Sequence, residues 1–171
     1  MSEADGPSTP ALDALAASGV RHRVVRTERA HSAEESAALQ GIELRQLLRT
    51  IVVRRGDDDY VFVLVPGGRR FDWPKLRDHL GVRRLSLPDQ DEAHEVTGYP
   101  RGAITPFGSS RTWPVIADES MVDLPIVAIG GGAHGVNIHL APADLVAATS
   151  AEVVDVTVPD APTEPGAAAT S

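Results

Sequence analysis

The fold is decided by the stretch Thr50-Ile51-Val52-Val53-Arg54-Arg55-Gly56-Asp57-Asp58-Asp59-Tyr60-Val61-Phe62-Val63-Leu64-Val65. Its two halves are apolar and rich in β-branched residues, which is typical of strands, and the glycine and three aspartates between them are typical of a turn. The stretch therefore predicts a β-hairpin. Because connections of hairpin length recur along the chain while helical patterns lie between the strands, we expect an α+β domain on a mixed sheet, not a doubly wound parallel sheet.

Helices and strands are predicted on both sides of this hairpin. Ser32 and Glu35 have the spacing of a capping box with Ser32 as the N-cap, and Gly41 is a typical residue to end the helix that follows. The predicted helices cover residues 12–18, 32–41, 43–48, 72–79, 89–96 and 143–148. The predicted strands cover residues 20–26, 50–55, 60–65, 82–87, 115–118, 126–129, 136–140 and 153–156.

The length and composition predict one globular domain with a tail at each end. The 171 residues fit one domain, and 42% of them are hydrophobic and 23% charged, an ordinary balance for a globular chain. Residues 1–10 and 158–171 are rich in small and polar residues and in proline, so we expect them to be disordered. The domain is expected to span residues 11–157.

The composition also excludes several kinds of chemistry. No cysteine is present, so disulfides, Cys-ligated zinc and thiol nucleophiles are excluded. The six histidines lack the spacing of a metal site on a helix, so we expect no metal. No apolar run approaches the roughly 20 residues that span a bilayer, and the acidic, polar N-terminus is unlike a signal peptide. We therefore expect a cytoplasmic protein with no membrane partner.

The charges are distributed unevenly along the chain. The net charge is −8, but residues 1–111 carry all 16 basic side chains and 16 acidic ones, whereas residues 112–171 carry 8 acidic side chains and no basic one. All basic residues except Lys75 are arginine, whose planar fork suits bidentate contacts with phosphate. Three arginine pairs could form a phosphate-binding stripe or could simply be solvated surface charges: Arg54-Arg55, Arg69-Arg70 and Arg83-Arg84.

The most unusual local feature is the loop Thr97-Gly98-Tyr99-Pro100-Arg101-Gly102-Ala103-Ile104-Thr105-Pro106-Phe107-Gly108. Three glycines and two prolines within twelve residues strongly constrain its backbone. Because no side chain at a glycine blocks the approach, such a loop can present N–H groups to an anionic or carbonyl oxygen. The alternative is that the loop simply connects a helix to a strand.

A second glycine-rich segment, Gly130-Gly131-Gly132-Ala133-His134-Gly135, joins two apolar strands. A dinucleotide-binding loop would require a helix after it, whereas Val136–Leu140 alternates like a strand. A hairpin turn with close backbone packing is therefore the better interpretation.

Arg49 stands immediately before the apolar strand of the central hairpin. It could end a helix and interact favourably with the helix dipole. It could instead project into a pocket and stabilise negative charge there. The segment alone leaves both interpretations open.

Taken together, these segments resemble the YbaK family, which includes the editing domain inserted in bacterial prolyl-tRNA synthetases. The resemblance covers roughly residues 11–157 and rests on several motifs that occur in the family's order. These motifs are Arg49-Thr50-Ile51-Val52-Val53, Leu76–Gly81 before Val82-Arg83-Arg84, Thr97-Gly98-Tyr99, Gly102-x-x-x-Pro106 with Phe107-Gly108, Gly131-Gly132-x-x-Gly135 before Asn137-Ile138-His139-Leu140, and Ala141-Pro142-Ala143-Asp144-Leu145.

The resemblance implies an α+β fold around a mixed, barrel-like sheet, and hydrolysis of the ester between a wrong amino acid and the 3′-terminal ribose of a tRNA. It implies neither a metal nor an organic cofactor. By the same resemblance Arg49 and Gly102 are the catalytic residues. Gly102 would help to hold the aminoacyl carbonyl, and Arg49, where relatives carry lysine, would supply a positive charge but no base. The implied substrate-binding residues are His31, Tyr99, Ile104, Thr105, Pro106, Gly131, Gly132 and Asn137.

Two functional hypotheses follow from the resemblance. The first is a trans-editing deacylase for tRNA charged with a small wrong amino acid, such as Cys- or Ala-tRNA(Pro). Its partner would be the 3′ end of aminoacyl-tRNA, an aminoacyl-tRNA synthetase is a second candidate partner, and DNA is not expected. The second is a non-catalytic module that binds aminoacyl-tRNA, an amino acid or a synthetase through the same pocket. The acidic C-terminal third fits a protein partner at least as well as RNA.

Overall fold

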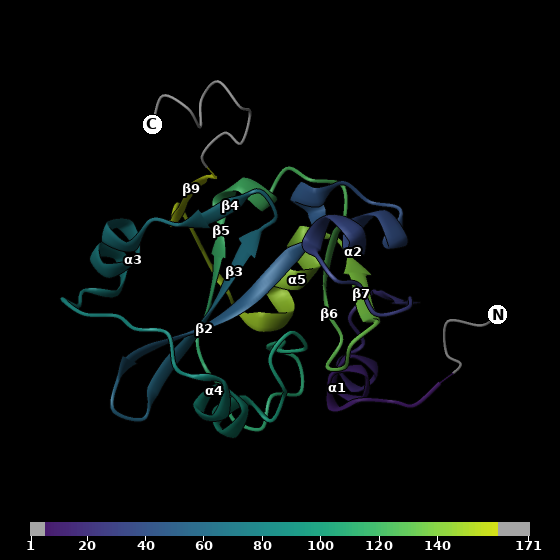
Figure 1. Cartoon of the computed structure of the whole chain (residues 1–171), viewed down its shortest axis with the longest axis horizontal. Helices are drawn as coiled ribbons and strands as arrows, with labels where there is room; N and C mark the ends of the chain where they lie inside the picture. The colour runs from purple at the N-terminus through teal and green to yellow at the C-terminus, as the bar shows by residue number, and fades with distance from the viewer. Residues whose placement is uncertain (1–5, 161–171) are drawn as a thin grey trace.

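The computed structural model describes residues 6–160, whose helices and strands are interspersed along the chain (Figure 1). The helices are α1 (Pro10–Ser18), α2 (Ala33–Gln40), α3 (Trp73–Leu80), α4 (Gln90–Thr97) and α5 (Pro142–Thr149), with 3-10 turns η1 (Leu44–Gln46) and η2 (Glu119–Met121). The strands are β1 (Arg23–Arg26), β2 (Leu48–Gly56), β3 (Asp59–Pro66), β4 (Arg69–Phe71), β5 (Val115–Asp118), β6 (Val127–Gly130), β7 (Val136–Leu140), β8 (Glu152–Val154) and β9 (Thr157–Pro159). The expected α+β class is confirmed.

The hairpin of β2 and β3 is the one that the sequence predicts. The two strands pair antiparallel with Ile51 opposite Val63. Asp58 in the turn has a left-handed φ of 53°, a conformation that aspartate tolerates because its short side chain can bond locally. Almost all of β3 is buried, because it lies between β2 and β5 and both of its faces are covered.

Two sheets and a smaller strand pair organise the domain. In the larger sheet the order is β2-β3-β5-β8, with β2 and β3 antiparallel and the other neighbours parallel. In the second sheet β7 lies between β1 and β6, and both pairings are antiparallel. Strands β4 and β9 form the separate pair. The mixed strand directions are those expected.

The two larger sheets join at one edge and do not close into a complete barrel within residues 6–160. An isolated bridge between Leu47 and Ala128 joins the two larger sheets where β2 meets β6. The outer strands of this arrangement, β1 and β8, do not pair with each other within residues 6–160. They are only four and three residues long, so they offer few backbone groups for a further pairing.

The hydrophobic core lies on both faces of β3. Phe62 and Leu64 belong to the larger cluster of buried side chains, whereas Val61 and Val63 belong to a second cluster. This division follows from the strand itself, because successive side chains point to opposite faces. Helix α3 contributes the fully buried Leu76 to the second cluster. Burial of a side chain of this size contributes about 2 kcal/mol.

The predicted cap of α2 is present with one difference. Ser32 Oγ accepts a hydrogen bond from Glu35 N–H at 3.0 Å, as a capping box requires. The Glu35 carboxylate, however, accepts from His31 N–H at 2.8 Å, one residue before the N-cap. The helix therefore begins at the predicted position, but the second hydrogen bond of the capping box comes from His31 N–H and not from Ser32 N–H.

The prediction of a strand over residues 82–87 is wrong. Only Ser86 pairs, through backbone hydrogen bonds of 2.8 and 3.1 Å with Arg54. Leu87 is 55% exposed, so the apolar residues of this segment do not form a buried face. The segment runs as an extended loop along the edge of β2, since it lacks the burial that stabilises a full strand.

Within the described residues, the folded domain extends past both of its predicted bounds, residues 11 and 157. Thr9 caps α1, and its Oγ1 donates to Gly131 O at 2.6 Å. Val158 lies in β9 and pairs with Arg70 of β4. These residues belong to the domain because they make long-range hydrogen bonds. The remainder of the expected tails, residues 1–5 and 161–171, lies outside the described residues.

A buried carboxylate ties the C-terminal strands to the larger sheet. Asp118, at the end of β5, has a side chain that is only 1% exposed. It accepts hydrogen bonds from Val156 N–H at 3.0 Å, from Ser120 N–H at 3.1 Å and from the Ser120 hydroxyl. The strand expected over residues 153–156 therefore ends at Val154, because Val156 directs its N–H to this carboxylate.

The electrostatic environment keeps Asp118 ionised. Burial raises the pKa of this carboxyl, but the hydrogen bonds from Ser120 and Val156 outweigh burial and leave the pKa below its usual value. The Arg69 guanidinium, 3.7 Å from Asp118 Oδ2, adds a favourable charge.

We expect Asp118→Asn to lower the free energy of unfolding by about 1–3 kcal/mol at neutral pH, because an amide NH2 would face the donors that the carboxylate satisfies. Denaturant unfolding measures the loss, with the exposed Asp123→Asn as control. Because the folded pKa of Asp118 is lowered, its contribution is present above about pH 4 and is lost as the pH falls through that folded pKa. The difference between wild type and variant should shrink in acid, and a constant difference would contradict this account.

Candidate active site

A cleft of about 750 Å³ opens beside the first half of β2. This volume lies within the range of small-ligand pockets, roughly 300–1,000 Å³. Its walls come from β2, the segment that leads into α4, the loop after α4 and the ends of β6 and β7. The lining residues are Ser36, Leu47, Leu48, Arg49, Thr50, Ile51, Val52, Leu87, Pro88, Asp89, Gln90, Ala93, Arg101, Gly102, Ile104, Gly130 and Asn137.

Arg49 supplies a positive charge at the exposed side of the cleft. It lies near the start of β2, and its side chain is exposed. Its Nη2 donates to Arg69 O of β4 at 2.7 Å, which limits the directions in which the guanidinium can point. The cation that the sequence singled out therefore borders the same cleft as the Gly102 loop.

Gly102 forms the corner of a tight turn on another wall of the cleft. Ala103 N–H donates to Pro100 O at 3.0 Å, and Gly102 has a φ of 87°, as the third residue of a type II turn requires. A Cβ at this position would lie 3.0 Å from His134 Cε1. Position 102 therefore favours glycine both for its backbone angle and for the space beside it.

Other residues of the glycine- and proline-rich loop pack into the core. Tyr99 is 2% exposed, and its hydroxyl donates to Phe107 O at 2.6 Å. Burial raises the pKa of Tyr99 to about 12, so the phenol stays neutral and remains a donor at physiological pH. Thr105 is fully buried in the same loop. These side chains hold the loop in shape behind the wall of the cleft.

The second glycine-rich segment forms the turn between β6 and β7, as the sequence predicts. Gly131 N–H donates to Val136 O at 2.8 Å across this hairpin. A Cβ at Gly132 would lie 2.8 Å from Tyr99 Cε1. These two glycines permit close packing, and Gly130 is the residue of the segment that borders the cleft.

The cleft brings together four of the ten residues that the sequence suggested for the site. Arg49, Gly102, Ile104 and Asn137 line it, and Asn137 Nδ2 also donates to Val25 O at 3.2 Å. The other six lie outside its lining and range from fully buried to exposed. They are His31, Tyr99, Thr105, Pro106, Gly131 and Gly132.

Thr50 is a residue of the cleft that the sequence did not single out. Its Oγ1 is buried and has no hydrogen-bond partner among the described residues. A buried hydroxyl without a partner costs about 1–3 kcal/mol, so a ligand that accepted or donated a bond here would gain affinity. Within an apolar strand a threonine is typical simply as a β-former, so the sequence gives no signal for this role.

The polar groups of the cleft favour binding and charge stabilisation. Asp89 is the carboxylate in its lining, and its Oδ1 already accepts from Glu92 N–H at 2.8 Å as the cap of α4. Arg49 and Arg101 supply positive charge. Within residues 6–160, no group of three His, Asp or Glu side chains could hold a metal ion. The same residues contain no helix of the length and apolarity that a bilayer crossing requires.

The sequence and the fold both match a known family. Residues 27–148 match the model of the aminoacyl-tRNA editing domain, so the chain belongs to this family and the resemblance to YbaK proteins is confirmed. A crystal structure of a candidate trans-editing enzyme for prolyl tRNA synthetase has the same fold, with a TM-score of 0.82 and 28% sequence identity. That comparison covers 90% of this chain and 99% of the other.

Curated relatives are of two kinds. EbsC of Enterococcus faecalis, a candidate Cys-tRNA(Pro)/Cys-tRNA(Cys) deacylase, is 26% identical over 126 residues, which is 74% of this chain and 77% of EbsC. The proline–tRNA ligase of Thermosipho melanesiensis is 30% identical over 120 residues, which is 68% of this chain but 21% of the ligase. The chain therefore spans only about a fifth of the length of that ligase.

We expect Thr50→Val to leave the free energy of unfolding unchanged or to raise it, because the lost hydroxyl has no partner within the described residues. The matched control is Thr97→Val. Thr97 Oγ1 donates to Ala93 O at 2.8 Å and accepts from Tyr99 N–H at 3.1 Å, so this variant should lose about 1–3 kcal/mol. Denaturant unfolding distinguishes them, and equal losses would show that the Thr50 hydroxyl is not available to a ligand.

Proposed function

We propose that this chain is a trans-editing deacylase that hydrolyses the ester between a wrong amino acid and the 3′-terminal ribose of a tRNA. The observation that supports this most directly is the cleft, which holds Arg49, the Gly102 turn and the unpaired Thr50 hydroxyl in a chain of the aminoacyl-tRNA editing family. Cys- and Ala-tRNA(Pro) are the substrates we expect. The relatives named as candidate enzymes for Cys-tRNA(Pro) and for prolyl tRNA synthetase support the choice of tRNA(Pro).

The proposed reaction requires stabilisation of one negative charge. Water attacks the ester carbonyl, the carbonyl oxygen becomes an oxyanion, and the bond to the ribose oxygen then breaks. The Gly102 turn would hold the carbonyl, and Arg49 would stabilise the developing charge. One well-placed donor to an oxyanion lowers the barrier by about 3 kcal/mol. The remaining rate enhancement would come from orienting an ester that the ribose already activates.

We do not assign the proton of the attacking water to Asp89, the carboxylate in the lining of the cleft. Asp89 Oδ1 caps α4, and the Arg49 guanidinium offers N–H donors but no acceptor for a proton. We therefore assign the proton relay to the free hydroxyl of the terminal ribose, next to the ester, which would pass a proton to the departing ribose oxygen. The chain would supply position and charge, and the substrate would supply the base.

The apolar part of the cleft would select the amino acid by size. Ile51, Val52 and Ile104 line it together with Ala93. A pocket of this kind separates substrates that differ by one methylene by about 1–3 kcal/mol. Discrimination between cysteine and alanine would therefore be limited, and activity on both is expected.

A second candidate function is binding without hydrolysis. The Arg49 guanidinium donates to Arg69 O at 2.7 Å, so it must give up or share this bond to reach an oxyanion. A guanidinium is also well suited to anchor a carboxylate or a phosphate in a stable complex. The chain would then hold aminoacyl-tRNA or an amino acid without cleaving it.

Deacylation kinetics with Arg49 variants separate the two functions. Arg49→Ala should lower kcat/KM for mischarged tRNA by about 100-fold, because a donor to the oxyanion is lost, whereas Arg49→Lys keeps the charge and should retain most of the activity. The control is Arg45→Ala, an exposed arginine paired with Glu43 outside the cleft. The assay uses Cys-, Ala- and Ser-tRNA(Pro), with correctly charged Pro-tRNA(Pro) as the resistant substrate.

Each outcome of this assay decides a part of the proposal. Hydrolysis by the wild type at a rate that Arg49→Ala leaves unchanged would remove Arg49 from the mechanism. Saturable binding of charged tRNA with no hydrolysis by the wild type would contradict the deacylase and favour the binding module.

Gly102→Ala tests the turn that would hold the carbonyl. The left-handed φ makes an alanine here cost about 1–2 kcal/mol of stability. Gly19→Ala is the matched control, because Gly19 has a φ of 74° at the end of α1 and nothing lies within 4 Å of its built Cβ. We expect Gly102→Ala to lose at least as much stability as Gly19→Ala, because its Cβ would also lie 3.0 Å from His134 Cε1, but we expect a loss of kcat/KM only from Gly102→Ala. Equal activity in the two variants would exclude a special role for Gly102.

A further inference from the structure

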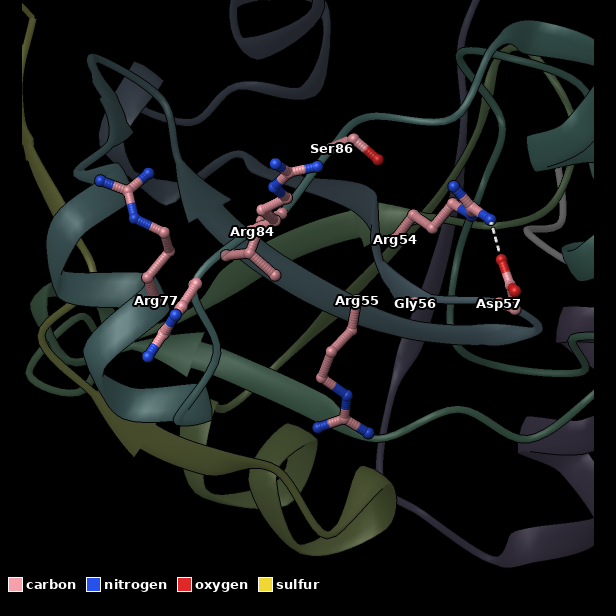
Figure 2. A pocket seen from close by; sticks show the side chains of 9 residues that line it. Arg54, Arg55, Gly56, Asp57, Arg77, Arg84 and Ser86 are labelled. Carbon is pink, nitrogen blue, oxygen red and sulfur yellow. Dashed lines mark hydrogen bonds and ion pairs between the residues drawn. The ribbon is translucent and has the colours of Figure 1, made fainter.

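A second concavity, of about 600 Å³, lies at the other end of β2 (Figure 2). Five of its nine lining residues are arginine and one is aspartate, so it carries a strong local positive charge on a chain of net charge −8. The proposed deacylation makes no use of this concavity, which we call the arginine basin. Its lining residues are Arg54, Arg55, Gly56, Asp57, Arg77, Arg83, Arg84, Leu85 and Ser86.

Two of the five guanidinium groups are already paired. Arg54 Nη2 lies 2.7 Å from Asp57 Oδ1, and its Nε lies 3.5 Å from Glu92. Arg55 forms a two-pronged contact with Asp59, at 2.9 and 3.1 Å. Neighbouring side chains of a strand point to opposite faces, and Figure 2 shows Arg55 directed away from Arg54. These two arginines therefore form a fixed edge of the basin.

The other three arginines carry unpaired charge. Arg77 projects from α3, and Arg83 and Arg84 follow in the loop after it. In the part of the chain that the structure describes, none of their guanidinium groups takes part in a hydrogen bond or ion pair. Arg83 and Arg84 are exposed and Arg77 is half-buried. Like charges held close together repel one another, so an anion that bridged them would be bound favourably.

The basin suits phosphate groups better than nucleotide bases. A guanidinium presents parallel N–H donors that match the oxygens of a phosphate. Bases are usually held by stacking on aromatic side chains, and none of the nine lining residues is aromatic. Contacts of this kind position a nucleic acid along its backbone and carry no sequence information.

The basin and the candidate active site are lined by neighbouring residues of the same two segments. On β2, residues 49–52 line the cleft and residues 54–56 line the basin. On the segment that leads into α4 and includes its first residue, residues 83–86 line the basin and residues 87–90 line the cleft. The backbone pair of Ser86 with Arg54 holds the two segments together. Arg54 lies five positions after Arg49 on β2, a span of about 17 Å that a few nucleotides can cover.

We propose that the arginine basin binds backbone phosphates of the tRNA whose aminoacylated 3′ end occupies the cleft. The proposal rests on the proposed function, because that function places the ester in the cleft and hence fixes the end from which the nucleotides extend. Arg77, Arg83 and Arg84 make the contacts, and Arg54 closes the basin on the side nearest the cleft.

The position and size of the basin favour RNA over other anionic partners. The basin is a concavity of about 600 Å³ lined by nine residues, so a narrow strand fits it better than an extended anionic surface does. A flexible RNA strand that extends from the cleft along β2 reaches the basin next. An acidic peptide could match the charge, but it has no reason to continue from the ester site.

The test is a titration of uncharged tRNA(Pro) transcript, followed by fluorescence anisotropy at several salt concentrations. The variant Arg83→Ala/Arg84→Ala changes two exposed side chains without partners. The charge-matched control is Arg21→Ala/Arg29→Ala, two exposed arginines at either end of β1 in the other sheet. We expect the first variant to bind at least about tenfold more weakly, with the slope of log K against log salt reduced by about 1.5, and the control to match the wild type.

Hydrolysis of a short substrate separates this proposal from the deacylase itself. Aminoacyl-adenosine carries the ester but no backbone phosphate, so Arg83→Ala/Arg84→Ala should cleave it at the wild-type rate while its KM for mischarged tRNA rises. If the wild type cleaves neither substrate, the proposed function fails, and the affinity for uncharged tRNA still decides the role of the basin. The proposal would be overturned if Arg83→Ala/Arg84→Ala bound uncharged tRNA with the wild-type affinity and salt slope. It would also be overturned if the wild type bound a polyglutamate peptide as tightly as it binds tRNA.

Discussion

The antiparallel pairing of β2 with β3 is the interaction on which the rest of the structure depends. β3 is buried on both faces, so it serves as the middle of the core, and its pairing fixes β2 along the edge of that core. The register sets Arg49 opposite Val65 near one end of β2 and Arg54 opposite Tyr60 near the other. Because the cleft and the arginine basin lie along this one strand, a slip in register would displace both sites together.

The ionised Asp118 links β2, through Arg69, to the C-terminal part of the chain. Its carboxylate holds the N–H of Val156 and lies beside the Arg69 guanidinium, and the carbonyl of Arg69 accepts the hydrogen bond from Arg49. The orientation of the candidate catalytic arginine thus depends on a hydrogen-bond and charge network whose other end is fully buried. Arg69 Nε also donates to Thr157 Oγ1 at 2.7 Å, which joins β4 to β9 in the same network.

Local sequence patterns predicted those parts of the fold that local physics determines. The β2–β3 hairpin and the cap at Ser32 follow from residue type and spacing, so they are found where expected. The pair of β4 and β9 was missed, because each strand has three residues and their partners lie almost ninety positions apart. Residues 82–87 have the composition of a strand but not its burial, and burial is a property of the whole fold.

The site could be predicted only in part for a related reason. The motifs that resemble the family's locate the loops, and Arg49 and Gly102 do border one cleft. A motif does not reveal which side chains of a loop face the cleft, and Tyr99 and Thr105 are buried outside its lining. Thr50 carries no sequence signal, because the burial of its hydroxyl without a partner among residues 6–160 is a property of the fold.

The central claim is that the aminoacyl ester lies in the cleft between Arg49 and the Gly102 turn. The most direct measurement is an NMR titration of the 15N-labelled chain with a non-hydrolysable 3′-aminoacylamino analogue of adenosine. The account predicts that backbone shifts change most at Thr50, Gly102 and Asn137, which line the cleft. Changes confined to another surface, or no change at concentrations that saturate tRNA binding, would contradict it.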